Sequence, residues 1–217
     1  MPTAKQPPRP RHRWFAFFYA KLIEPSDRKT MGPLRRFADG GARGRVLEIG
    51  AGTGANLDYY DWAQVESLDM SEPDPFMARH IRPRLEALPA EVRAKVRLHE
   101  APAEQLPFPD ATFDCAVVTL VLCSVSDLDA SIAELRRVLK PGGELRIVEH
   151  VKADGRRATV QSLVQPVYGW MSGECQLGRR TEDALRAGGF DVDVTQRTAF
   201  GPLWPAFAGT ARRRTAS

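Results

Sequence analysis

Glu48-Ile49-Gly50-Ala51-Gly52-Thr53-Gly54 is the most informative stretch of this sequence, because three glycines at alternate positions follow a short apolar run. The pattern predicts a strand over 45–49 and a helix that begins at 55–60, so the glycines form the turn between them. Such a turn lets backbone N–H groups approach a ligand closely, and the N-terminus of the following helix favours an anion. The stretch therefore predicts a nucleotide-type binding site.

The glycine spacing by itself leaves the class of nucleotide open. A nicotinamide or flavin site prefers the pattern G-x-G-x-x-G, and the position three residues after Gly52 is Ala55, a substitution that this pattern tolerates. An acidic residue is expected where the second strand ends, because a carboxylate there can accept hydrogen bonds from both ribose hydroxyls. Asp69 and Glu72 compete for this position.

Strands and helices alternate along the rest of the chain. Strands are predicted at 45–49, 65–70, 96–99, 113–122, 144–149, 191–197 and 205–212, and helices at 14–23, 27–39, 76–88, 128–139 and 181–187. Glu24-Pro25-Ser26 is expected to separate the first two helices, and Pro83 to split or kink the third. The run 113–122 is apolar almost throughout, which is typical of a strand buried on both faces of a parallel sheet. The alternation predicts an α/β fold with a doubly wound sheet.

The chain of 217 residues is long enough for one domain with a sizeable core. We expect this domain to span 14–212, with N-terminal cap helices at 14–39 and an insertion at 152–178 that covers the binding site. The tails 1–13 and 213–217 are expected to be disordered, because terminal segments rich in charge have nothing apolar to bury.

The charge pattern and the apolar runs exclude two classes of partner. The formal net charge of +4 comes largely from the two ends of the chain, and basic tails are usually solvated. No helix-turn-helix, zinc finger or aromatic RNA-binding signature is present, so no nucleic-acid partner is expected. The best apolar run, 14–23, is shorter than the roughly 18 residues of a membrane span and contains Lys21. No transmembrane segment is predicted.

The three cysteines, Cys115, Cys123 and Cys175, are odd in number and widely spaced. This pattern argues against a disulfide framework and against a zinc cluster, so no metal site is predicted. A reducing cytoplasm is the simplest location for three free thiols.

Three blocks in a fixed order carry a resemblance to a known family. Glu48 gives the glycine turn the form E-x-G-x-G-x-G, and the stretches AEQLPFPDATFD at 103–114 and LRRVLKPGG at 135–143 follow it. Together these blocks resemble the class I S-adenosylmethionine-dependent methyltransferases. The resemblance implies a Rossmann-like sheet of seven strands, S-adenosyl-L-methionine as cofactor, and transfer of its methyl group to a small-molecule acceptor.

The resemblance also implies which residues bind the cofactor. The expected contacts are Tyr19, Glu48, Gly50, Ala51, Gly52, Asn56, Asp69, Glu72, Pro73, Ala103, Glu104, Thr119 and Leu120. Glu72 is preferred over Asp69 for the ribose, because Glu72-Pro73-Asp74-Pro75 is similar to the E-P-x-P block of relatives.

The sequence indicates how the adenine ring and Tyr19 are placed. Pro102 stands where many relatives carry an acidic residue for the adenine amino group, so backbone N–H groups at Ala103 or Glu104 are expected to bind the ring edge. Tyr19, on the first predicted helix, is expected either to close over the cofactor or to pack within the helix pair.

Three shorter blocks point to a narrower group: VTLVLCSV at 118–125, EHV at 149–151 and GECQL at 173–177. They resemble blocks of methyltransferase-like proteins that include the alkyl thiol methyltransferases, although Glu174 and Gln176 stand where relatives often carry Gly and His. The resemblance implies S-methylation of a small-molecule thiol. The alternatives are N-, O- or C-methylation of a phospholipid, quinone or other metabolite, a cofactor-binding scaffold without catalysis, and a nicotinamide oxidoreductase.

Methyl transfer from a sulfonium is an in-line displacement, so the nucleophile must be held about 3 Å from the methyl carbon. His150, at the carboxyl end of the fifth strand, is the candidate general base, with a structural role as its alternative. The candidate substrate-binding residues are Cys123, Tyr168, Trp170, Met171 and Cys175. For Cys175, a packing role is preferred over a methylated-enzyme intermediate.

Overall fold

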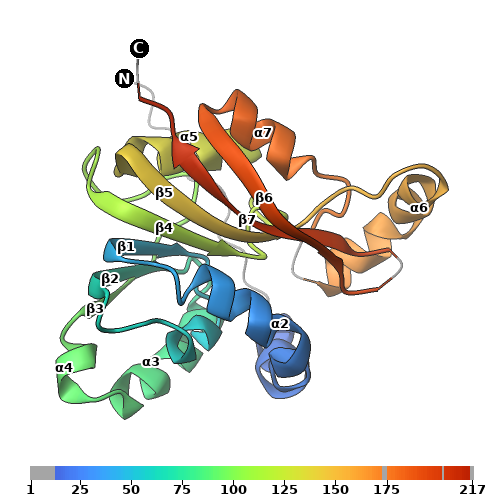
Figure 1. The fold of residues 1–217 in the computed structure, drawn as a ribbon. Coiled ribbons are helices and arrows are strands. Elements are labelled where there is room, and N and C mark those ends of the chain that lie inside the picture. Colours follow the sequence, from blue (N-terminus) through green and yellow to red (C-terminus); the bar gives the residue numbers. More distant parts are fainter. Residues whose placement is uncertain (1–12, 173–174, 202, 216–217) are drawn as a thin grey trace, which may run out of the picture.

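The computed structural model describes residues 13–172, 175–201 and 203–215. Within these ranges a seven-stranded sheet has the order β3-β2-β1-β4-β5-β7-β6 (Figure 1). The strands are β1 (Gly44–Ile49), β2 (Val65–Ser71), β3 (Val96–His99), β4 (Phe113–Thr119), β5 (Leu139–His150), β6 (Phe190–Ala199) and β7 (Pro205–Arg213). The predicted α/β fold, a Rossmann-like doubly wound sheet in a single domain, is confirmed.

The pairing of the strands creates one edge at which several of them end. β1 pairs in parallel with β2 and with β4, β2 pairs in parallel with β3, and β4 pairs in parallel with β5. β7 lies antiparallel between β5 and β6. The chain leaves β1 toward β2 and β3 and then returns to β4 on the other side of β1, which makes a topological switch point. Ligands of open α/β sheets bind in the crevice outside the carboxyl ends of the strands at such a point.

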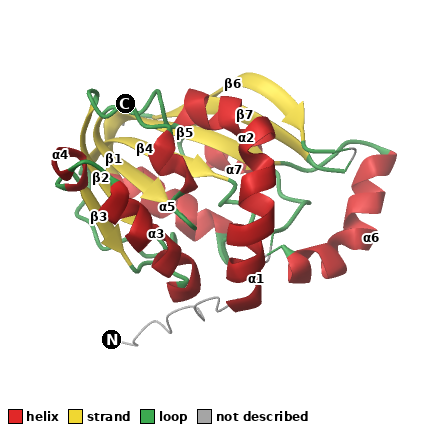
Figure 2. Ribbon diagram, turned by 90° about the horizontal axis from the view of Figure 1, so that it is seen from below, coloured by secondary structure: helices red, strands yellow, loops and turns green. Residues whose placement is uncertain are grey.

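Helices cover both faces of the sheet (Figure 2). They are α1 (Arg13–Phe18), a π-helix (Tyr19–Ile23), α2 (Glu24–Ala38), a 3-10 helix (Ala55–Asp58), α3 (Pro75–Ala87), α4 (Ala90–Arg93), α5 (Leu128–Val138), α6 (Arg156–Met171) and α7 (Thr181–Ala187). None of these helices, which are those of the described ranges, is long and apolar enough to cross a membrane.

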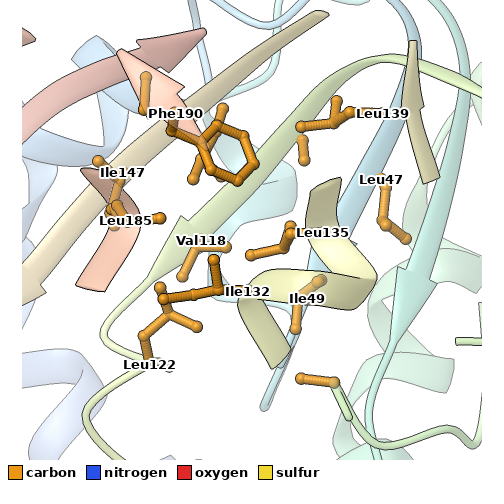
Figure 3. Close-up of a cluster of buried hydrophobic side chains, with 14 of the residues drawn as sticks. Leu47, Ile49, Val118, Leu122, Ile132, Leu135, Leu139, Ile147, Leu185 and Phe190 are labelled. Atoms are coloured by element: carbon orange, nitrogen blue, oxygen red, sulfur yellow. The ribbon is translucent and has the colours of Figure 1, made fainter. Parts of the chain in front are cut away.

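Alternation along the strands divides the core between the two faces. Leu47 and Ile49 of β1 point into the cluster beneath α5 and α7, which Figure 3 shows. Val46, the residue just before Leu47, belongs to the cluster on the opposite face, where Ile81 of α3 packs. Because both faces of the central strands are covered, their sequences are apolar at nearly every position.

Helix α2 is fastened to the sheet at its C-terminal end. Its apolar side chains pack on Val148 of β5 and on β7. Arg146 of β5 donates from Nε to the Ala38 carbonyl at 2.8 Å and from Nη2 to the Phe37 carbonyl at 2.7 Å. These bonds satisfy carbonyl groups that a helix end leaves without an intrahelical partner. The opposite end of α2, which begins at Glu24, is thereby directed to the glycine turn.

The N-terminal helices differ from the prediction. Glu24-Pro25-Ser26 does not separate two helices, because the π-helix Tyr19–Ile23 leads directly into α2. Pro25 is the second residue of α2 and follows the π-helix without an intervening turn.

Three further boundaries differ from the prediction. The helix expected at 55–60 is only a single 3-10 turn that Gly54 precedes in the left-handed conformation, at φ +78°. Helix α3 is not split at Pro83, which lies on its exposed face, where water can reach the carbonyl that Pro83 leaves unbonded. Strand β4 ends at Thr119 instead of continuing to residue 122, because Leu120 turns out of the strand with φ +57°.

The left-handed Leu120 gives a prediction about stability. Glycine adopts this conformation at little cost, whereas alanine keeps the Cβ clash that disfavours it by roughly 1–2 kcal/mol. We therefore expect Leu120→Gly to have a larger free energy of unfolding than Leu120→Ala, by about 1 kcal/mol, in urea denaturation.

Ala133→Gly is the matched control, because Ala133 is an exposed residue inside helix α5. There the order reverses, and glycine should be less stable than alanine by about 1 kcal/mol. A Leu120→Ala protein as stable as Leu120→Gly would contradict the strain argument.

Candidate active site

Four segments meet at the carboxyl edge of the parallel strands. Cα partners in the sheet include Ile49 with Ser71 and Ile49 with Val118, so the segments that follow β1, β2 and β4 leave the sheet side by side. His150 ends the neighbouring strand β5. The register of the sheet therefore places the glycine turn, Glu72 and the end of β4 beside one another, and their joint role as a cofactor site stays a prediction.

The glycine turn presents its backbone toward this edge. Gly50, Gly52 and Gly54 all have positive φ, between 59° and 78°. The Gly52 N–H donates to Oε2 of Glu72 at 2.7 Å. A Cβ added at Gly52 would meet Met77 Cε at 3.5 Å and the Gly50 carbonyl oxygen at 3.9 Å, which are ordinary contact distances. Binding of a ligand against the backbone of this turn stays a prediction.

The two acidic candidates for the ribose have different partners. Glu72 accepts a second backbone N–H, that of Asp74, at 2.8 Å, and burial raises the pKa of Glu72 to about 7. Asp69 lies within β2, and its Oδ1 is 2.7 Å from Nε2 of His99 on β3. Glu72 thus lies against the glycine turn, whereas the carboxylate of Asp69 is engaged by the neighbouring strand.

Glu48 and Asn56, both predicted as cofactor contacts, bind each other in the interior. Asn56 Nδ2 donates to Oε1 of Glu48 at 2.9 Å, and the Tyr60 hydroxyl donates to Oε2 at 3.0 Å. Arg35 of α2 donates to the Asn56 side-chain oxygen. Burial raises the pKa of Glu48 to about 7. The network ties the 3-10 turn and α2 to β1, and direct contact of either residue with a cofactor stays a prediction.

Glu24 is part of the site, and sequence reasoning missed it. The Thr53 hydroxyl of the glycine turn donates to Oε2 of Glu24 at 2.5 Å, and Arg84 of α3 pairs with the other oxygen. Glu24 therefore links the cap helix, the glycine turn and α3. Its position before Pro25 marked a helix boundary in the sequence, and no local pattern indicated a contact 29 residues away.

The loop after β4 is held by a carboxylate whose role sequence reasoning also missed. Glu149 of β5 is fully buried and accepts the backbone N–H groups of Val121 and Cys123 at 2.6 and 2.7 Å. Burial raises the pKa of Glu149 well above its ordinary value. The hydroxyl of Thr119, just before this loop, is buried and has no hydrogen-bond partner among the described residues. Glu149 thus ties the loop to β5, and the Thr119 hydroxyl beside the loop can take a ligand as its partner.

The remaining predicted cofactor contacts occupy mixed positions. Ala103 is buried in the core cluster of Figure 3. Oε1 of Glu104 accepts the backbone N–H groups of Ser126 and Asp127, at 2.8 and 3.1 Å, so its side chain orders the approach to α5. Tyr19 lies half-buried in the π-helix that joins α1 to α2. The predicted backbone contact to adenine and closure by Tyr19 stay predictions.

Three of the predicted substrate residues, Cys123, Tyr168 and Cys175, lie together with His150 beside this edge. Cys123, His150 and Cys175 are all buried, with Nδ1 of His150 3.6 Å from Sγ of Cys175. Tyr168 packs on the cysteines, and its ring lies 5.7 Å from that of Trp204. A hydrogen bond with Cys175 and burial raise the pKa of the Cys123 thiol well above its ordinary value.

Two of the predicted substrate residues cannot be placed in this cluster. Trp170 and Met171 belong to helix α6, but their side chains lie outside the described part of the structure. Trp204, which packs with the cysteines, comes instead from the start of the β7 segment, where no sequence pattern pointed to a site.

The chain is similar in sequence to known proteins. The family described as "Methyltransferase domain" matches residues 47–147. The chain is 32% identical to a phosphatidylethanolamine N-methyltransferase of Cereibacter sphaeroides, with 88% of this chain and 89% of that protein covered. It is 35% identical to thiol S-methyltransferase TMT1B of Homo sapiens, with 77% of this chain and 71% of that protein covered.

A solved structure has the same fold at low sequence identity. The geranyl diphosphate C-methyltransferase of Streptomyces coelicolor A3(2), in complex with S-adenosyl-L-homocysteine, aligns with a TM-score of 0.65 at 13% identity. The alignment covers 84% of this chain and 77% of that chain.

Burial of Glu48 predicts a pH dependence of stability. Its pKa in the folded protein, about 7, lies above the ordinary 4.5, so the folded state binds more protons between these values. The stability that Glu48 contributes is therefore fully present below pH about 4.5 and is lost as pH rises through about 7. Between pH about 5 and about 8, Glu48→Gln should lose less free energy of unfolding than the wild type, by on the order of 1–3 kcal/mol.

The measurement is urea denaturation at a series of pH values without added cofactor. Glu66→Gln is the control, because Glu66 is an exposed carboxyl on the neighbouring strand β2 and should follow the wild type. Parallel curves for the wild type and Glu48→Gln would refute the assignment.

Proposed function

The chain belongs to the class I S-adenosylmethionine-dependent methyltransferases, and on that basis we propose that its acceptor is the sulfur of a small-molecule thiol. Two observations support this finer assignment. One is the 35% identity to a thiol S-methyltransferase over 77% of the chain. The other is the cluster of sulfur and aromatic side chains beside the carboxyl edge, formed around Cys123, Tyr168 and Cys175.

In this proposal the glycine turn and Glu72 hold the cofactor. The buried Thr119 hydroxyl, which has no hydrogen-bond partner among the described residues, fits a ligand along this edge. The carboxylate of Glu72, already at the glycine turn, accepts the hydrogen bonds of the ribose hydroxyls. When bound, S-adenosylmethionine supplies a methyl group on a positively charged sulfur. The chain's own residues position the acceptor in line with that group, and such positioning accounts for much of the rate that this reaction needs.

The acceptor thiol must also lose its proton, because the thiolate is the nucleophile. The proposed general base is His150, which ends β5 at the carboxyl edge. Its Nδ1 lies 3.6 Å from Sγ of Cys175, and its ring makes a T-shaped contact with that of Phe200, with ring centroids 5.2 Å apart. In this proposal His150 accepts the proton through Nε2.

A lipid acceptor is the second candidate, and an exposed apolar row on α6 favours it. Leu163 and Val167 are 75% and 65% exposed, and Val160 continues the row one turn earlier. Helix α6 projects from the body of the molecule beside the ends of β6 and β7 (Figure 1). The similarity to a phosphatidylethanolamine N-methyltransferase agrees with this alternative.

Cofactor binding through Glu72 has a direct test. Glu72→Gln should weaken the binding of S-adenosyl-L-homocysteine about tenfold to a hundredfold in titration calorimetry, because an amide offers one acceptor oxygen and no charge to the ribose hydroxyls. Asp69→Asn, on β2 just before Glu72, is the matched variant, and its affinity should remain within about threefold of the wild type. A larger loss in Asp69→Asn than in Glu72→Gln would reverse the assignment.

The acceptor class can be tested with labelled cofactor. We expect the methyl group to appear as an S-methyl product when aliphatic and aromatic thiols are offered, and not on phenols, quinones or phosphatidylethanolamine vesicles. Leu163→Asp separates the two candidates. A charge on the exposed row of α6 should abolish methylation of phosphatidylethanolamine in vesicles and leave thiol methylation unchanged. Methylation confined to vesicles and sensitive to Leu163→Asp would establish the lipid alternative instead.

A further inference from the structure

Two thiols and an imidazole that lie far apart in the sequence share one buried point in the fold. Cys123 follows β4, His150 ends β5, and Cys175 follows α6. The two Sγ atoms and a ring nitrogen of His150 all lie within 4.8 Å of one another, and all three residues are buried. The distance from Nδ1 of His150 to Sγ of Cys175 is 3.6 Å.

We infer that these three residues form a binding site for a thiophilic divalent metal ion, with Zn²⁺ as the best match. Zinc binds thiolates at about 2.3 Å and imidazole nitrogen at about 2.0–2.1 Å in tetrahedral geometry. Simple trigonometry then places a ligating sulfur and nitrogen about 3.6 Å apart, and two sulfurs about 3.8 Å apart. The cluster therefore needs only small movements to hold the ion.

Hydrogen bonds connect the backbone segments that carry the cluster. The N–H of Gln176 donates to the Cys123 carbonyl at 2.7 Å, which joins the two cysteine segments directly. Gln165 of α6 holds the segment that carries Cys175 by two hydrogen bonds. Its Nε2 donates to the Cys175 carbonyl and its Oε1 accepts the Leu177 N–H, both at 2.8 Å. Glu149 holds the N–H of Cys123 from the other side. Outer contacts of this kind orient the ligands of metal sites.

A bound metal ion accounts for the proximity of both thiols and the imidazole, whereas a disulfide or apolar packing accounts only for the two cysteines. A disulfide between Cys123 and Cys175 would use both sulfurs and leave the imidazole nitrogen of His150 without its sulfur partner. Apolar packing accounts for buried cysteines but not for the imidazole beside them. Wide spacing argued against a zinc cluster in the sequence, but here each ligand comes from a different element, so sequence spacing does not report on their distance.

Coordination has two consequences for the chain. A histidine that ligates through Nδ1 keeps its proton on Nε2, so His150 is a ligand when the ion is bound, and the general-base role proposed above applies to the metal-free protein. Three protein ligands also leave one position of a tetrahedral ion for a water or another small ligand. The inference does not depend on which acceptor is methylated, because its test measures metal binding and not turnover.

Cobalt is the probe, because Co²⁺ takes the place of Zn²⁺ and reports thiolate ligation by its charge-transfer absorption. The reduced, metal-free protein, titrated with Co²⁺ without oxygen, should bind one ion with a thiolate charge-transfer band, and Zn²⁺ should displace it. Cys123→Ser combined with Cys175→Ser should remove the band. Cys115→Ser is the matched control, because Cys115 is a buried cysteine of β4 outside the cluster and should leave the band intact.

X-ray absorption of the wild-type protein with Zn²⁺ gives a second measurement that needs no variant to fold. Two sulfur scatterers near 2.3 Å and at least one nitrogen near 2.0–2.1 Å are expected. Zn²⁺ should also raise the melting temperature of the wild type and of Cys115→Ser, because an ion bound only by the folded state stabilises it. A shell of oxygen and nitrogen alone, no charge-transfer band, or a band that persists without Cys123 and Cys175 would overturn the inference.

Discussion

Parallel pairing of β1 with β2 and with β4 is the constraint from which the site follows. Parallel neighbours end at the same edge, so the glycine turn, Glu72 and the loop that begins at Leu120 emerge beside one another. Apolar side chains on both faces of these strands hold the pairing in register, since a slip by one residue would turn each buried side chain toward the wrong face. The apolar core thus determines where the site lies.

Buried carboxylates then order what the strands bring together. Burial raises the pKa of Glu48, of Glu72 and of Glu149, because a charged group loses its hydration when it leaves water. Converging N–H and O–H donors offset part of that cost, and each carboxylate thereby ties a loop to a strand. Methyl transfer depends on the alignment of donor and acceptor, so rigidity at this edge has a direct functional value.

The parts of the fold predicted correctly are those with a local pattern. Short apolar runs located the strands, and the spaced glycines located the turn, because both patterns reflect backbone geometry over a few residues. The end of β4 was predicted three residues too late, since an apolar run does not reveal that Leu120 turns into the left-handed conformation. The short turn after Gly54 was predicted as a longer helix for a similar reason, because the network around Glu48 and Asn56 is not visible in the local sequence.

From the sequence alone came the fold class, the position of the nucleotide-type turn and the resemblance to a methyltransferase family, because contiguous residues carry all three. Only the tertiary structure joined Glu24 to Thr53 and separated the environments of Asp69 and Glu72. It also brought the thiols of Cys123 and Cys175 to the imidazole of His150. The physical reason is the same in each case: such contacts depend on how separate elements pack and in which register strands pair, and spacing along the chain does not contain that information.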